Sequence, residues 1–431
     1  MSETGVTARA AALRLLHGVL FDRRVMSELT DGPRSVLERV SPADRARAQS
    51  IAQGVLRSLS ALDQRIDPFV EKPPAFRVRT ILRIVAYELL EDGLPAYGVV
   101  NAAVHLAKAQ PKSARQGGLV NAVGRKLAEL DRADWSARPP ETLPSWLAKP
   151  ITKAFGAECV DAIAAAHQAG APVDLSLRDQ SSAAEWAQKL DATRLPGGSL
   201  RLNKSGQISA LDGFDAGAFW VQDAAAAMPV KALGDVAGMR VLDLCAAPGG
   251  KTMQLAAAGA KVTALDISEN RLARVRQNLD RTGLTAEVVA ADALTYTAAP
   301  FDAILLDAPC SATGTIRRHP DLPHAKAGAD LSGLFTLQSA LIDRAVQLLK
   351  PGGTLIYCTC SLLPKEGEWQ VAEALKRHDI LEAEKIDPEL LGADPSWATE
   401  NGAIRVRPDY WSARGGLDGF YIAKLVKTTE T

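Results

Sequence analysis

The sequence has no long apolar run, no excess of charge of either sign and few cysteines. No apolar segment reaches the about 18 unbroken residues that suggest a membrane-spanning helix, so we expect no membrane partner. The first residues include Glu3 and lack a positive segment followed by an apolar one, so we expect no secretory signal. Because 50 basic residues balance 50 acidic ones, the chain as a whole is not a basic coat for nucleic acid.

The cysteines are too few and too irregularly spaced for a disulfide framework. They are Cys159, Cys245, Cys310, Cys358 and Cys360. An odd number without framework spacing is typical of a reducing compartment, so we expect free thiols and a cytoplasmic protein. The Cys-x-Cys pair has no second Cys or His pair at ligand spacing, which predicts no metal site. A single buried cysteine is usually structural, and we assign that role to Cys159 and Cys358.

The length of 431 residues predicts two or three domains. Prolines in the segment 133–146 indicate the first boundary. We therefore predict a helical domain over residues 1–135, a linker helix with a small α/β unit over 140–232, and a larger α/β domain over 233–431.

The first of these domains shows helical spacing of apolar residues and no strand-like alternation. The segment 41–44 (S-P-A-D) has the order of a helix start, with a Ser cap, Pro at the first position and an acid in the first turn. The predicted helices include residues 6–21, 76–90, 99–109 and 118–130. Residues 1–140 contain 21 Lys and Arg but 15 Asp and Glu. This excess of six positive charges suits RNA binding, but a scaffold or dimerisation module is equally compatible with it.

The middle region is shorter and mixed. Residues 147–168 have the pattern of a helix, and strand-like runs follow at 173–178 and 199–202. A predicted helix over 182–190 separates these runs. This arrangement predicts a small α/β unit of the RRM-like type.

The larger domain is organised around Val241–Thr252, which predicts a strand, a small-residue turn and a helix. This layout directs backbone N–H groups and a helix N-terminus at a ligand, and two glycines let the backbone approach it. A phosphate-binding P-loop needs glycine where Cys245 stands, and the dinucleotide pattern G-x-G-x-x-G is absent. The segment is thus a ligand-binding turn of another type.

Three further apolar runs end in carboxylates. They are Val262–Asp266, Ala286–Asp292 and Ala303–Asp307. Parallel strands bring their carboxyl ends to one edge of a sheet, which is where open α/β sheets bind ligands. Asp266 follows the glycine turn by one predicted helix and one strand, so its carboxylate is a candidate acceptor for the hydroxyls of a ribose.

Two cysteine segments end neighbouring predicted strands. Asp307–Ser311 follows one strand and Leu355–Ser361 contains another. We expect the sheet to bring Cys310 and Cys360 to the same edge, beside the glycine turn. Two thiols next to a cofactor cleft suggest nucleophilic catalysis. Carbon 5 of a pyrimidine needs such help, because a thiolate that adds to carbon 6 makes carbon 5 nucleophilic enough to accept a methyl group. The residues alone do not decide which thiol attacks.

Two segments of the helical region resemble the NusB-like RNA-binding bundle. They are L-P-A-Y-G-V-V-N-A-A-V-H-L-A-K-A (94–109) and G-L-V-N-A-V-G-R-K-L (118–127), and they occur in the expected order. The resemblance implies that residues 1–135 bind RNA.

The rest of the chain, from about residue 140 to 427, resembles the RNA cytosine-C5 methyltransferases of the Nop2/Sun type. The motifs that carry this resemblance are V-L-D-L-C-A-A-P-G-G-K-T (241–252), D-A-P-C-S-A-T-G-T (307–315), R-R-H-P-D (317–321), Y-C-T-C-S (357–361) and D-G-F-Y-I-A-K-L (418–425). With the NusB-like front end, the chain resembles the branch that modifies bacterial small-subunit (16S) rRNA. A local insertion, Asp409-Tyr410-Trp411, departs from the family pattern.

The resemblance implies a Rossmann-like class I methyltransferase domain with a seven-stranded, mostly parallel sheet, and S-adenosylmethionine as cofactor. Asp266 is then assigned to the ribose, Asp292 to the adenine side, and Asp307 to the methionine amino end and the target base. The loop residues assigned to the cofactor are Cys245, Ala246, Ala247, Pro248, Gly249, Gly250 and Lys251.

The same resemblance assigns the chemistry. Cys360 is the nucleophile, Cys310 releases the product, and Lys251 and Asp307 order the pocket of base and cofactor. DNA cytosine-C5 methyltransferases use the cysteine of a Pro-Cys turn, which is the place of Cys310 here, so the choice of Cys360 is inherited from the family.

The expected substrate is small-subunit rRNA, and the protein is expected to be a monomer. Arg317 and Arg318 directly follow a catalytic segment, so we predict that they contact RNA phosphates. The target base must leave its stack to reach Cys360. Two alternatives are a tRNA cytosine-C5 methyltransferase and a non-catalytic RNA-binding assembly factor.

Overall fold

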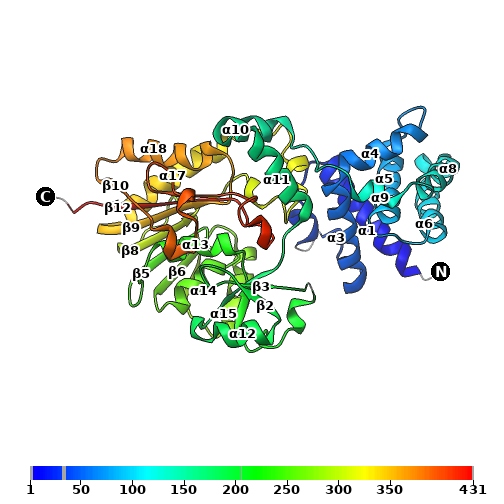
Figure 1. The fold of residues 1–431 in the computed structure, drawn as a ribbon. Helices are drawn as coiled ribbons and strands as arrows, with labels where there is room; N and C mark the ends of the chain where they lie inside the picture. Colours follow the sequence, from blue (N-terminus) through cyan, green and yellow to red (C-terminus); the bar gives the residue numbers. More distant parts are fainter. Residues whose placement is uncertain (1–2, 32–34, 205, 430–431) are drawn as a thin grey trace. The chain divides into compact units, whose positions relative to one another are not determined.

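The computed structural model describes residues 3–31, 35–204 and 206–429, and the chain divides into two compact units (Figure 1). The helical unit comprises residues 1–149, 160–168 and 318–329. The catalytic unit comprises residues 150–159, 169–317 and 330–431. No helix in the described part of the chain is long and apolar enough to cross a bilayer.

The helical unit contains no strand among its described residues. Its helices are α1 (Glu3–Leu20), α2 (Met26–Thr30), α3 (Pro42–Arg57), α4 (Leu59–Ile66), α5 (Phe76–Leu90), α6 (Ala96–Lys108), α7 (Pro111–Ala114), α8 (Gly117–Ala128) and α9 (Arg132–Ser136). The predicted start of α3 is confirmed, because Ser41 caps it by accepting the N–H of Asp44 at 3.2 Å.

Helix α5 runs through the centre of this unit. Its apolar residues are almost all buried and pack against α1, α3, α6 and α8. Glu88 is also fully buried on α5, where its carboxylate accepts hydrogen bonds from Arg9 (2.6 Å) and Arg47 (2.9 Å). A buried charge needs partners of this kind, so the polar residue is compatible with the core.

A segment from much later in the chain completes the helical unit. Residues 318–329 carry α16 (Leu322–Ala325), and both end residues of this helix are buried. The carboxylate of Asp321 accepts the backbone N–H of Met26 at 2.7 Å. The sequence pattern predicts a contiguous helical domain over residues 1–135. That prediction leaves out residues 318–329, which pack with this unit.

The predicted helix over 147–168 is wrong in one respect, because two helices occupy this region. Helix α10 (Ser145–Phe155) ends at Gly156, and α11 (Ala157–Ala169) begins after it. Gly156 has a φ of +88°, a left-handed conformation that breaks the helical path and that glycine adopts without strain.

The small α/β unit contains a four-stranded antiparallel sheet in the order β2-β3-β1-β4. The predicted strands are present, and two short ones join them. The strands are β1 (Asp174–Leu177), β2 (Ala192–Arg194), β3 (Leu200–Leu202) and β4 (Phe219–Val221), with α12 (Ala183–Lys189) between the first two. Phe219 and Trp220 of β4 are buried, so these aromatic residues pack the unit.

The catalytic domain has the predicted mostly parallel, seven-stranded path in the order β10-β12-β9-β8-β5-β6-β7, and β11 pairs with β12 beside it. Pairs among β7, β6, β5, β8 and β9 are parallel, and those of β12 are antiparallel. The strands are β5 (Arg240–Leu244), β6 (Lys261–Asp266), β7 (Glu287–Ala290), β8 (Phe301–Asp307), β9 (Leu349–Thr359), β10 (Leu381–Glu384), β11 (Ile404–Val406) and β12 (Phe420–Lys427).

Helices cover both faces of this sheet (Figure 1). Helices α13, α14 and α15 lie on one face, and α17 and α18 lie on the other. Their bounds are α13 (Ala224–Ala232), α14 (Gly250–Ala257), α15 (Glu269–Thr282), α17 (Ser332–Leu348) and α18 (Glu368–Arg377), and a short α19 (Pro388–Leu391) follows. With both faces covered, only the strand ends are open to a ligand.

The insertion Asp409-Tyr410-Trp411 is part of the packing of this unit. The ring of Tyr410 stacks on Trp397 with centroids 4.6 Å apart. The carboxylate of Asp409 pairs with Arg407 at 2.8 Å. These contacts give the insertion a structural role.

Candidate active site

The predicted cofactor loop joins β5 to α14. Cys245 ends the strand with a φ of +63°, and Gly249 has a φ of +100° immediately before the helix. This left-handed conformation favours glycine, and a Cβ at position 249 would also lie only 3.2 Å from the side chain of Val275. The backbone N–H of Ala246 is bonded to Leu265 of β6 at 3.0 Å. These features hold the loop against the end of the neighbouring strand.

Asp266 connects the same loop to the start of α15. One carboxylate oxygen accepts the N–H of Ala247 at 3.2 Å, and the other accepts the N–H of Ser268 at 3.0 Å. Arg271 lies 3.4 Å from the first oxygen on a largely exposed side chain. These hydrogen bonds fix the direction of the Asp266 side chain at the end of β6.

Asp243 is a buried carboxyl that the sequence analysis did not single out. It lies inside β5, and one oxygen accepts the hydroxyl of Thr252 at 2.6 Å. The other oxygen has no hydrogen-bond partner among the described residues. Burial raises the pKa of Asp243 to about 7. Its position between apolar residues in V-L-D-L could have indicated a buried carboxyl within the strand.

Lys251, in the first turn of α14, forms an ion pair with Asp307 at the end of β8. Their charged atoms lie 2.7 Å apart, and Lys251 is buried. Burial lowers the pKa of Lys251, but the charge of Asp307 outweighs it and raises that pKa above its ordinary value. The lysine is therefore a fixed cation. Cys358, fully buried on β9, lies with its sulfur 3.7 Å from the other oxygen of Asp307.

The two cysteines at the strand ends are adjacent, as the sequence analysis expected of neighbouring strands. The sulfurs of Cys310 and Cys360 lie 3.5 Å apart, and both residues are partly exposed. The hydrogen bond to Cys360 and burial raise the pKa of Cys310 well above its ordinary value. Cys310 is thus a thiol that can donate its proton to the other sulfur.

Glu366 organises the loops that carry these cysteines, and the sequence analysis missed it. It is fully buried, and one carboxylate oxygen accepts the N–H of Ser311 at 2.8 Å. The other oxygen accepts the hydroxyls of Ser311 and Ser361. A lone glutamate in a Pro-Lys-Glu-Gly turn is normally a surface residue, so no signal in the sequence pointed to it.

Other predicted site residues lie apart from this cluster. Asp292 is exposed two residues beyond β7, where it accepts the N–H of Leu294 at 2.9 Å. Arg317 is fully buried, pairs with Asp418 at 2.6 Å and also bonds to Asp223. Two carboxylates enclose the guanidinium, which gives Arg317 a structural role, and its contact with RNA stays a prediction. Arg318 is half-buried and belongs to the helical unit.

Comparisons with known proteins agree with this geometry. Residues 230–426 match the family described as 16S rRNA methyltransferase RsmB/F, and residues 6–129 match the NusB family. The ribosomal RNA small subunit methyltransferase B of Shigella flexneri serotype 5b is 37% identical over 417 residues, covering 90% of this chain and 92% of the relative. That of Erwinia tasmaniensis is 37% identical over 413 residues with the same coverage.

The chain belongs to the ribosomal RNA small subunit methyltransferase B family. The crystal structure of a methyltransferase homolog from Pyrococcus horikoshii is 29% identical and covers 65% of this chain and 93% of its own, with a TM-score of 0.53. NSun6 from the same organism is 21% identical, covers 67% and 100%, and has a TM-score of 0.56, which shows a shared fold.

As a methyltransferase of this family, the chain uses S-adenosylmethionine. The residues at the strand ends fit that group. Its sulfonium is a cation, and acidic groups stand near the loop: burial, then the charges of Asp307 and Asp266, raise the pKa of Cys245 to about 12.

Proposed function

We propose that this family member methylates carbon 5 of a cytosine in small-subunit rRNA through a covalent bond between Cys360 and carbon 6. The observation that carries the proposal is the pair of sulfurs, 3.5 Å apart, at the strand ends beside the cofactor loop. A methyl transfer to oxygen or to an amine needs no second thiol. Transfer to carbon 5 needs one thiol to attack and a group to remove a proton.

The proposed reaction has an addition, a methyl transfer and an elimination. The thiolate of Cys360 adds to carbon 6 of the flipped cytosine, which places electron density on carbon 5. Carbon 5 would then bond to the methyl group of S-adenosylmethionine, while the sulfur–methyl bond of the cofactor would break and leave a neutral thioether. A base then takes the proton from carbon 5, the carbon 6–sulfur bond breaks, and the aromatic ring is restored. The thiolate is regenerated on Cys360.

The contacts of Cys310 support this division of labour. A hydrogen bond to Cys360 and burial keep the proton on Cys310, and the S–H donor stabilises negative charge on the neighbouring sulfur. We therefore assign the attack to Cys360. Cys310 is the group nearest to it that can act as an acid and base during release.

The remaining predicted residues hold the two substrates. We expect Asp266 to accept the ribose hydroxyls of the cofactor and Asp292 to lie on its adenine side. Lys251 is a fixed cation whose partner, Asp307, lies at the end of β8 just before the Cys310 loop. This pair is suited to orient the cytosine ring between the cofactor loop and the thiols. Arg318 is proposed to contact a phosphate.

The substrate proposal follows from the relatives, which are named ribosomal RNA small subunit methyltransferase B. Two features of the chain support it. The helical unit matches the NusB family over residues 6–129, and residues 1–140 carry an excess of positive charge. RNA binding takes much of its affinity from such charge.

Covalent trapping tests the chemistry. The full chain is incubated with the cofactor and small-subunit rRNA, and a denaturing gel separates protein from any protein–RNA adduct. We expect Cys310→Ala to accumulate the adduct, because attack proceeds and release fails. Cys360→Ala should give neither adduct nor 5-methylcytosine. Cys159→Ala is the matched control and should behave as the unchanged protein.

The reverse pattern would assign attack to Cys310 and overturn the proposed roles. Detection of 5-methylcytosine by mass spectrometry of the digested RNA tests the reaction class separately. If the unchanged protein transfers a methyl group to RNA but to no cytosine carbon, the proposed function is wrong.

A further inference from the structure

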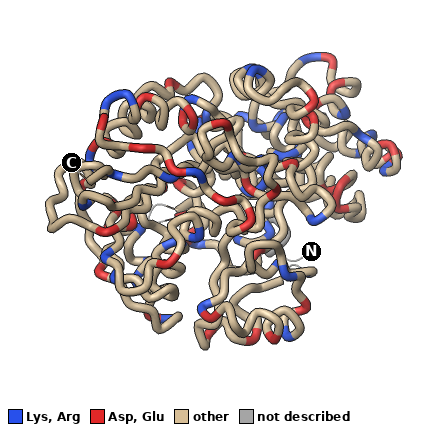
Figure 2. The backbone as a smooth tube through the Cα atoms, turned by 60° about the vertical axis from the view of Figure 1, so that its left-hand side comes forward, with Lys and Arg blue, Asp and Glu red and all other residues tan. Residues whose placement is uncertain are grey.

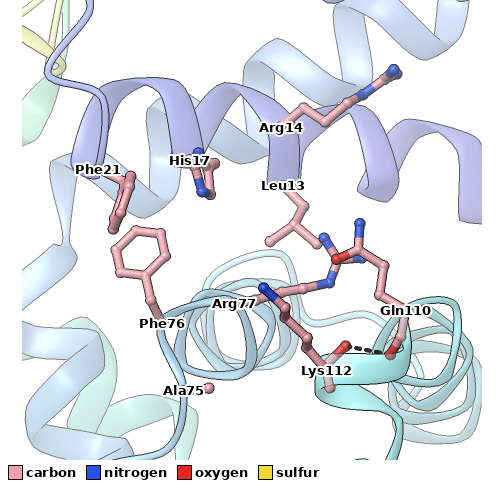
Figure 3. Close-up of a pocket in the computed structure, with 10 residues that line it drawn as sticks. Leu13, Arg14, His17, Phe21, Ala75, Phe76, Arg77, Gln110 and Lys112 are labelled. Atoms are coloured by element: carbon pink, nitrogen blue, oxygen red, sulfur yellow. Dashed lines mark hydrogen bonds between the residues drawn. The ribbon is translucent and has the colours of Figure 1, made fainter.

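A pocket of about 420 Å³ lies within the helical unit, far along the chain from the active-site residues (Figure 3). Three segments form it: α1 with the residue that follows it, the start of α5, and the α6–α7 connection with α7. The volume falls in the range of small-ligand pockets, which is enough for one nucleotide.

An aromatic cluster forms one wall of this pocket. The ring centroids of Phe21 and Phe76 lie 5.4 Å apart, and His17 lies 4.9 Å from Phe21 and 5.6 Å from Phe76. Phe21 is 62% exposed. Burial of an exposed aromatic ring is favourable, because it removes apolar surface from water. This wall is therefore suited to stack against a flat apolar partner. His17 already bonds to Asp22 at 3.3 Å on the rim, so stacking is its available interaction.

Cations line the other side of the pocket. Figure 3 shows Arg77 and Lys112 reaching into the space opposite the rings, while Arg14 extends outward from α1 at the rim. Arg77 donates to the carbonyl of Leu106 at 3.2 Å, but its buried Nε has no hydrogen-bond partner among the described residues. The described contacts give Arg14 and Lys112 no ion pair, and none of the lining residues is acidic.

One acid, Asp22, bonds to His17 beside the pocket, but the lining itself contains no acid. Basic and acidic positions are interspersed along both units (Figure 2). Some arginines of the helical unit are paired with acids, as Arg79 and Arg83 are with Asp63. The cationic side of the pocket is therefore a local concentration of positive charge beside exposed rings.

We propose that this pocket binds one nucleotide of a single-stranded RNA segment, with the base stacked on Phe21 and Phe76 and the phosphate on Arg77 and Lys112. A π-face next to an anion is the chemistry of a nucleotide, and aromatic stacking with basic neighbours is the usual way that proteins hold unpaired RNA. The proposal rests on RNA being the substrate, and it adds a second contact point remote in sequence from Cys360.

RNA affinity measures the proposal directly. The probe is a labelled single-stranded RNA about 12 nucleotides long, and the full chain is titrated into it while fluorescence anisotropy is recorded. We expect Phe21→Ala to weaken binding about tenfold, because base stacking on an aromatic ring is lost. Phe21→Trp should retain binding. Lys112→Ala should reduce the slope of log affinity against log salt by about 0.7, the value for one phosphate contact.

Matched controls come from the same unit. Tyr97 is an aromatic residue that is 82% exposed and does not line the pocket, and Lys126 is an exposed lysine elsewhere. Tyr97→Ala and Lys126→Ala should bind the RNA as the unchanged protein does. Ultraviolet crosslinking to the same RNA, mapped by mass spectrometry, should identify peptides that contain Phe21 or Phe76.

Unchanged RNA affinity in Phe21→Ala, together with crosslinks outside the pocket, overturns the proposal. The same result is expected if the pocket binds an acidic peptide and not RNA. The two proposals fail in different ways. Crosslinks in the pocket without any 5-methylcytosine would leave the RNA pocket standing and refute the methylation. Cytosine methylation with normal RNA affinity in Phe21→Ala would refute the pocket alone.

Discussion

Glu366 is a charged side chain with no exposure to solvent, and its carboxylate bonds to groups on both cysteine loops. It also accepts a hydrogen bond from Gln338 of α17 at 3.1 Å. A carboxylate that only accepts is suited to this place, because every neighbouring group donates. The relative position of Cys310 and Cys360 therefore depends on a residue that touches neither sulfur.

The first prediction concerns this positioning residue. Glu366→Gln introduces an amide that cannot accept at every site, so we expect it to cost about 1–3 kcal/mol of unfolding free energy. The shifted loops should lower kcat by up to about 100-fold while KM for the cofactor changes little. Urea unfolding and steady-state methylation of rRNA measure the two effects. Glu373→Gln, on the exposed side of α18, is the control and should change neither.

The second prediction concerns pH. Because burial raises the pKa of Asp243 from 3.8 to about 7, the folded state holds its proton where the unfolded state has lost it. The contribution of Asp243 to the unfolding free energy is therefore fully present below about pH 4. It falls as the pH rises toward 7, by up to about 1.4 kcal/mol per pH unit.

Asp243→Asn should remove this part of the pH dependence, so its urea midpoint should vary less between pH 5 and pH 8 than that of the unchanged protein. The exposed Asp212 provides the control, since Asp212→Asn should leave the dependence as it was. An equal pH dependence in Asp243→Asn and the unchanged protein would show that Asp243 titrates normally.

At the scale of elements, Arg317 connects parts of the catalytic unit that are distant in sequence. Asp223 caps the start of α13, and Asp418 precedes β12. Arg317 bonds to both, and it donates to the carbonyl of Gly415 at 2.9 Å. The chain that leaves the Cys310 loop is thus anchored by a buried ion network and not by surface contacts.

The third prediction separates the two neighbouring arginines. Arg317→Gln removes the cation that bonds to the buried carboxylates of Asp223 and Asp418, so we expect a loss of about 3–5 kcal/mol of unfolding free energy. Arg318→Gln should instead weaken RNA binding with a smaller cost in stability. Urea unfolding and RNA titration of both variants decide this. Normal stability in Arg317→Gln with reduced RNA affinity would support the RNA-contact prediction.

At the scale of the whole molecule, the helical unit is not a contiguous stretch of chain. Residues 318–329 lie in it although the residues on either side belong to the catalytic unit. Within this unit, His324 contacts the carbonyl of Leu56 at 3.1 Å, and Arg23 donates to the carbonyl of His324 at 2.8 Å. The chain therefore crosses between the units again after the active-site loop.

The fourth prediction tests this anchorage. Asp321→Ala leaves the N–H of Met26 without its acceptor in a buried place, so it should destabilise the helical unit by about 1–3 kcal/mol. Hydrogen exchange should speed up in α1, α2 and α16, while the strands β5, β6, β8 and β9 stay protected. Asp161→Ala, at an exposed position of the same unit, should leave exchange unchanged. Equal protection in both variants would contradict the anchorage.

Local patterns were sufficient for much of the fold and for the central part of the site. The stretch 241–252 carries its strand, turn and helix in adjacent residues, so its structure follows from glycine conformation and apolar spacing. The proximity of Cys310 and Cys360 was predictable because parallel neighbouring strands end at one edge. The helix α5 was predicted with its observed ends, since its buried face repeats at helical spacing.

The tertiary structure decided what each isolated polar residue does. Arg317 and Glu366 stand in segments rich in charged and turn residues, and sequence spacing alone cannot tell a buried ion partner from a surface charge. Their partners come from about 30 to 100 positions away, so the burial exists only once the elements have packed. The same holds for residues 318–329, because their membership of the helical unit depends on contacts with residues near position 26.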